Sequence, residues 1–67
     1  MLTEVKEIDT IYRLESMIGD LCYIGDVYEQ EQCAIPIIEE IAHSHEAGMI
    51  TIEARILLHK LIQNILY

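Results

Sequence analysis

The chain has 67 residues, of which 52% are hydrophobic, and its formal net charge is −8 at pH 7. A chain of this length forms one domain, near the lower size limit at which a single core can stabilise a fold. The negative charge disfavours direct contact with DNA, RNA or an anionic membrane, because phosphate groups repel it.

The first predicted element is one long helix over residues 3–31. Its apolar or small residues recur three and four positions apart, which is typical of a helix that packs along one seam. These residues are Ile11, Leu14, Ile18, Leu21, Gly25 and Tyr28. Thr3 can cap the helix, and Asp9 and Arg13 have the spacing of an ion pair on one helical face.

Gly19 and Gly25 are the main evidence against a continuous helix. Each glycine costs about 1 kcal/mol inside a helix, and residues 23–28 favour a strand by propensity. A break near Gly19 or Gly25 is therefore the alternative. We favour the continuous helix because the apolar seam passes through both glycines in phase.

The second predicted helix covers residues 35–47, after a junction or kink near residues 33–35. Pro36 suits the first turn of a helix but not its interior. The apolar face of this helix consists of Ala34, Ile38, Ile41, Ala42 and His45. Gly48 supplies a stop signal at its end.

The last predicted helix follows Thr51, which can cap it, with Glu53 in its first turn. The short connection predicts that the last two helices are antiparallel or steeply crossed neighbours. Residues 49–67 carry apolar side chains almost all the way round such a helix. A surface helix normally has one apolar stripe, and a chain this short has little else to cover a second.

We therefore predict that the last helix packs against a second copy of the chain or a partner. The predicted interface consists of Ile52, Ile56, Leu58, Leu61, Ile62 and Ile65. The expected fold class is all-α: a single domain over residues 1–67, built as a small helical hairpin or three-helix unit. One long N-terminal helix and two shorter helices self-associate into a helical bundle.

The strongest candidate binding surface lies on the outer side of the first predicted helix. At about 100° per residue, a set of aromatic, small and acidic residues gathers opposite the apolar seam. These residues are Tyr12, Glu15, Ser16, Gly19, Asp20, Tyr23 and Asp26. Tyrosine faces and carboxylates together suit a docked arginine or lysine. The alternative is that this face packs against the last helix, with Gly19 allowing a close approach.

Glu40 and His43 form a second candidate, a metal site. Their Glu-x-x-His spacing carries metal in carboxylate-bridged helical bundles, because positions three apart share a helical face. A di-metal site needs two such motifs, so only a symmetric dimer could supply the second. A solvated polar face accounts for the same two residues, and we favour it.

Two further features carry less weight. Cys22 and Cys33 lack the number and spacing of a disulfide framework or metal motif, so we expect packing residues in a reducing cytoplasm. The last two helices could instead form a DNA-reading helix-turn-helix. Such a unit would present Ile52, Glu53, Arg55, Ile56, His59 and Lys60. The surrounding negative charge makes this set a poor reader of a DNA groove.

The expected function is non-enzymatic and needs no cofactor. We predict a small acidic regulator or adaptor whose partners are a second copy of itself and a protein with a basic surface. Inhibitors of nucleic-acid-binding proteins, such as phage-type anti-defence proteins and antirepressors, offer an analogy of size and charge alone. The alternatives are a metal-binding bundle that uses Glu-x-x-His across a dimer, and a structural subunit of a homo-oligomer.

Overall fold

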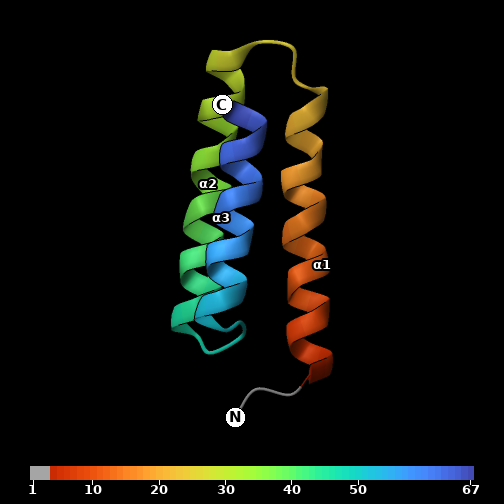
Figure 1. Cartoon of the computed structure of the whole chain (residues 1–67), viewed down its shortest axis with the longest axis vertical. Helices are drawn as coiled ribbons and strands as arrows, with labels where there is room; N and C mark the ends of the chain where they lie inside the picture. The colour runs from red at the N-terminus through yellow and green to blue at the C-terminus, as the bar shows by residue number, and fades with distance from the viewer. Residues whose placement is uncertain (1–3) are drawn as a thin grey trace.

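The computed structural model describes residues 4–67, and the side chains of residues 6–67. The helices are α1 (Glu4–Asp20), the short 3-10 helix η1 (Leu21–Tyr23), α2 (Val27–Glu46) and α3 (Ile52–Leu66). α2 runs antiparallel to both α1 and α3, so the two connections lie at opposite ends of an elongated bundle (Figure 1). The predicted all-α fold with three helices is confirmed.

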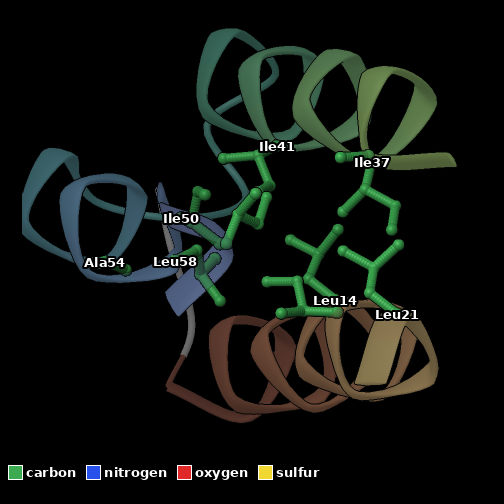
Figure 2. Close-up of a cluster of buried hydrophobic side chains, with 10 residues drawn as sticks. Leu14, Leu21, Ile37, Ile41, Ile50, Ala54 and Leu58 are labelled. Carbon is green, nitrogen blue, oxygen red and sulfur yellow. The ribbon is translucent and has the colours of Figure 1, made fainter. Parts of the chain in front are cut away.

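The core is one apolar stripe from each helix, pointing into the space between them (Figure 2). The buried apolar residues are Leu14, Ile18, Leu21, Ala34, Ile37, Ile41, Ile50, Ala54, Leu58 and Ile62. Those within the helices recur mostly three and four positions apart, which keeps them on one side of each helix, and Ile50 lies in the connection before α3. Burial of one large aliphatic side chain contributes roughly 1.5–3 kcal/mol, so this cluster is the main stabilising interaction of the fold.

The predicted continuous helix over residues 3–31 is wrong, and the alternative of a break near Gly19 or Gly25 is right, because the chain leaves the helix between Asp20 and Val27. α1 ends at Asp20, and η1 leads to Ile24, whose φ of −88° and ψ of 120° are extended. Gly25 and Tyr28, which the predicted seam would have buried, are exposed. The apolar seam ends at Leu21 because the chain turns back there and packs on itself.

Two side chains stabilise this turn. The Asp26 carboxylate accepts the backbone N–H of Tyr28 at 2.8 Å and caps the start of α2. The Gln30 side-chain amide donates to the backbone carbonyl of Leu21 at 2.9 Å. An aspartate cap of this kind contributes about 1 kcal/mol, and the reversal also lets α1 and α2 bury their stripes against each other.

α2 is longer than the predicted helix over residues 35–47, and it passes through Pro36 with no junction at residues 33–35. Proline in a helix interior costs about 3 kcal/mol or more. Buried residues lie on both sides of it along the same stripe, namely Ala34, Ile37 and Ile41. Pro36 itself is exposed, so its ring and the missing N–H lie on the outer side while burial holds the helix together.

The predicted apolar face of this helix is partly right. Ala34 and Ile41 are buried, and Ile38, Ala42 and His45 are half-buried. Ile37 and Ser44, which were not on the predicted face, are buried as well. The stripe is wider than predicted because α2 packs against two neighbours, α1 on one flank and α3 on the other.

The predicted stop at Gly48 is confirmed. Gly48 has a φ of +77°, in the left-handed region that favours glycine. Its N–H donates to the His45 carbonyl at 3.0 Å, and the N–H of Met49 donates to the Ser44 carbonyl at 2.8 Å. This pair of bonds is a Schellman ending, which satisfies the last carbonyl groups of the helix.

The predicted start of the last helix is confirmed too. The Thr51 hydroxyl accepts the Ala54 N–H at 3.3 Å, and Glu53 lies in the first turn of α3. The connection from Gly48 to Thr51 places α2 and α3 side by side and antiparallel, as one of the two predicted arrangements (Figure 1).

Arg13 does not form the predicted pair with Asp9. Its Nη2 donates to Oε1 of Glu40 at 3.2 Å, which links α1 to α2 across 27 positions of the sequence. Both side chains are partly exposed to solvent, so the ion pair contributes at most about 1 kcal/mol. The predicted cap by Thr3 lies outside the described residues.

We expect Leu58→Ala to destabilise the fold by about 2–5 kcal/mol, because it leaves a cavity in the core. Ile35→Ala is the matched control: Ile35 is 47% exposed on the outer side of α2, and surface changes cost about 0.5 kcal/mol or less. Urea unfolding followed by circular dichroism measures both. Equal effects of the two variants would contradict the placement of Leu58.

Two substitutions of glycine by alanine should change the free energy of unfolding in opposite directions. Gly48→Ala forces a side chain into the left-handed region and should cost about 1–2 kcal/mol. Gly19 lies within α1, and an added methyl group there meets nothing within 4 Å. Gly19→Ala should therefore stabilise by about 0.5–1 kcal/mol. Thermal unfolding midpoints of the two variants test this prediction, and shifts in the same direction would refute it.

Candidate protein-binding surface

The outer face of α1 is exposed to solvent. Tyr12 is 68% exposed, and the further exposed residues of the predicted surface on this helix are Glu15, Ser16, Gly19 and Asp20. They lie on the side opposite the buried Leu14 and Ile18. The alternative that this face packs against the last helix is wrong, because α3 contacts α1 through the buried stripe instead.

The remaining two predicted residues do not belong to α1. Tyr23 lies in η1 and is 89% exposed. Asp26 starts α2, and one of its carboxylate oxygens accepts the Tyr28 N–H. The predicted surface is therefore divided into an outer helical face that includes Tyr12 and an end of the bundle that includes Tyr23.

The tertiary structure brings more aromatic residues to that same end. Val27 and Tyr28 begin α2, and the C-terminus of the chain lies at the end that carries the α1–α2 connection (Figure 1). The apolar and aromatic side chains exposed there are Tyr23, Val27, Tyr28 and Tyr67. Together with Asp20, Asp26 and Glu29 we call these residues the tyrosine end. Sequence reasoning missed Tyr28 because the predicted seam buried it, and Tyr67 because only the chain topology brings the C-terminus to the end that carries the α1–α2 connection.

Negative charge is concentrated on this part of the chain. Residues 14–54 contain no lysine or arginine, and Asp20 and Glu29 are exposed. Two of the basic residues already have partners: Arg13 is hydrogen-bonded to Glu40, and Arg55 contacts His45. With no lysine or arginine in residues 14–54 to neutralise them, the carboxylates of the tyrosine end create a negative potential that favours cationic groups over anionic ones.

A shallow depression of ≈ 270 Å³ lies at one edge of the outer face of α1. It is lined by Ile8, Ile11, Tyr12 and Glu15, so an apolar floor adjoins one tyrosine ring and one carboxylate. Clefts for small molecules enclose about 300–1,000 Å³. A smaller depression that is open to solvent suits a single protruding side chain of a protein partner better than a bound metabolite.

Glu40 and His43 are not brought together with further ligands. The Glu40 carboxylate forms an ion pair with the Arg13 guanidinium, and the His43 side chain is exposed. Within the described side chains, no group of three or more histidine, cysteine, aspartate or glutamate residues is placed to hold a metal ion. A site completed by a second copy would have to compete with Arg13 for Glu40.

His45 is half-buried between α2 and α3. Its Nδ1 lies 3.0 Å from Nη1 of Arg55. A guanidinium group only donates, so a hydrogen bond here uses Nδ1 as the acceptor. The contact ties α3 to α2 and occupies one of the basic groups that a DNA-reading helix would need.

The helix-turn-helix alternative does not fit this geometry. The two helices of that motif cross at about 90–120°, whereas α2 and α3 lie antiparallel along their length (Figure 1). Of the residues that would face DNA, Arg55 and His59 are half-buried. The remaining set does not provide a basic surface.

The predicted interface residues of α3 separate into two groups. Leu58 and Ile62 are buried in the core of a single chain, and Ile65 packs partly buried against it. Ile52, Ile56 and Leu61 remain exposed. This corrects the predicted interface, since Leu58 and Ile62 are not available to a second copy in this fold.

Cys22 and Cys33 are free and exposed, so the predicted packing role is wrong for both. The register of η1 and α2 turns their side chains outward from the core. Among the described helices, none has the length and apolar character needed to cross a bilayer.

Comparison with known proteins provides no assignment: no family model, no curated protein and no solved structure matches the chain at a significant level. Function is therefore inferred from the surfaces of the bundle.

Both thiols should react with Ellman's reagent in the folded protein, without denaturant, at two equivalents per chain. The reason is that Cys22 and Cys33 are exposed and unpaired. Absorbance at the reagent's product wavelength measures the stoichiometry, with a urea-unfolded sample as the control. Thiols that react only after unfolding would contradict the turn and the register of α2.

Proposed function

We propose that this protein is a non-enzymatic, acidic regulator that binds a basic surface of another protein. The tyrosine end supports this proposal, because exposed tyrosine side chains stand among carboxylates there. The outer face of α1 extends the same chemistry through Tyr12 and Glu15. The expected location, the cytoplasm, belongs to this proposal.

Tyrosine and carboxylate side chains act together on a cationic group. A tyrosine ring attracts an arginine or lysine through its π face, with about 0.5–1 kcal/mol at an exposed position. A carboxylate adds a charge-assisted hydrogen bond, which arginine can make with two parallel N–H groups. Asp20 ends α1, and Tyr23 follows three positions later in η1. One basic side chain can therefore contact both.

The overall charge supports the same kind of partner. A net charge of −8 on 67 residues steers a basic protein toward the bundle and repels other acidic proteins. Nucleic-acid-binding proteins have the basic surfaces that this charge would attract. We propose that the chain covers such a surface and competes with nucleic acid for it, as phage-type anti-defence proteins and antirepressors do; the analogy is of size and charge.

Asp20→Lys and Tyr23→Ala should each weaken capture of the basic partner from the native cell by about tenfold, since each removes roughly 1–2 kcal/mol of contact at an interface anchor. The partner is identified by mass spectrometry, and its dissociation constant is then measured by calorimetry. Both residues are exposed, so helical content should not change. Glu39→Lys, at an exposed position of α2, is the control with the same change of charge.

Two results would contradict the proposed function. One is a captured protein that binds the Asp20→Lys and Tyr23→Ala variants as tightly as the unchanged chain. The other is the absence of any heterologous partner, which would favour a structural subunit. Addition of nucleic acid should release the captured protein, because both ligands are proposed to occupy one basic surface.

A further inference from the structure

The outer face of α3 carries apolar residues that the bundle does not cover. Ile52, Ile56, Leu57 and Leu61 are 48%, 49%, 62% and 42% exposed. The inner stripe of the same helix, which includes Leu58 and Ile62, is already buried in the core. α3 therefore has one apolar side inside the molecule and a second that faces solvent.

The exposed residues form two stripes on α3. Ile52 and Ile56 are four positions apart, as are Leu57 and Leu61, and positions four apart lie above one another on a helix. The contact of Arg55 with His45 shows that the side of α3 that carries Arg55 faces α2. At about 100° per residue, the isoleucine stripe lies toward that flank, and the leucine stripe lies on the opposite flank, toward α1.

Glu53 and Lys60 lie between the two stripes. They are seven positions apart, which places them within about 20° of one line along the helix. The rise of 1.5 Å per residue separates them by about 10 Å, too far for an ion pair with each other. Neither has an ion-pair partner among the described residues of its own chain.

These six residues are arranged symmetrically about one point. They form three pairs, and the two members of each pair are equally far in sequence from the midpoint between positions 56 and 57. The pairs are Glu53 with Lys60, Ile52 with Leu61, and Ile56 with Leu57. A two-fold axis that passes beside the outer face of α3 at the level of this midpoint, perpendicular to the helix, generates an antiparallel second helix. It sets Glu53 opposite Lys60 of the second copy and packs each apolar stripe against the same stripe of that copy.

We infer that the outer face of α3 is an antiparallel two-fold interface between two copies of this chain, with two Glu53–Lys60 ion pairs across it. Charge selects a second copy as the occupant. α3 carries one acid, Glu53, and two bases, Arg55 and Lys60, a net charge of +1, whereas the whole chain carries −8. α3 is therefore the helix at which two copies repel each other least, and the antiparallel register makes its charges complementary, whereas a parallel pairing would set Glu53 against Glu53.

This interface lies on α3, whereas the proposed partner surface lies on α1 and the tyrosine end. The two proposals can therefore fail independently. Sedimentation equilibrium of the full chain at micromolar concentrations tests the interface. We expect a dimer for the unchanged chain, and dimer dissociation constants at least tenfold higher for Glu53→Lys and for Lys60→Glu, because each places like charges opposite each other.

Combining the two charge-reversing substitutions distinguishes this arrangement from others. A mixture of the Glu53→Lys and Lys60→Glu chains should form a dimer again, and so should the chain that carries both substitutions. Glu39→Lys, at an exposed position of α2, should leave the dimer unchanged, and circular dichroism checks that each variant is helical. A monomeric unchanged chain, single variants that dimerise normally, or a mixture that stays monomeric would each overturn the inference.

Discussion

Burial of one apolar stripe from each of three helices within a single chain is the constraint on which the rest of the structure depends. The turn over residues 21–26 makes it possible, because it returns α2 alongside α1 and lets Leu14 and Ile41 lie in one core (Figure 2). The Schellman ending at Gly48 likewise reverses the chain, so that α3 packs its apolar stripe alongside α2. A straight first helix would have left its seam open to solvent, at a cost of roughly 1.5–3 kcal/mol for each large side chain exposed.

Once the core is closed, the composition leaves two chemically different surfaces. The tyrosine end and the outer face of α1 combine aromatic rings with carboxylates, and residues 14–54 have no lysine or arginine. The outer face of α3 is apolar and carries one exposed acid and one exposed base. We propose a cationic protein as the partner of the first surface and a second copy of this chain as the partner of the second, where repulsion between copies is least. The two proposed contacts lie on different faces and would not compete with each other.

Local signals in the sequence were reliable where a single residue or short motif decides the backbone. Gly48 ends α2 and Thr51 caps α3 as predicted, because left-handed φ and side-chain capping involve only neighbouring residues. Pro36 was misleading for the opposite reason. Its local cost of about 3 kcal/mol is offset by the stripe of α2 that is buried on both sides of it. Half of the candidate surface, around Tyr12, follows from helical periodicity, whereas the tyrosine end does not.

By itself, the sequence determined the helical class, much of the apolar periodicity, the negative charge and the start of α3. Only the tertiary structure decided where the first helix ends, that Arg13 pairs with Glu40, and that Leu58 is internal while Leu57 is not. It also decided that the C-terminus lies at the end of the bundle that carries the α1–α2 connection (Figure 1). The physical reason is that these outcomes depend on contacts between residues distant in the chain, whose free energies exceed the local preferences that a sequence pattern reports.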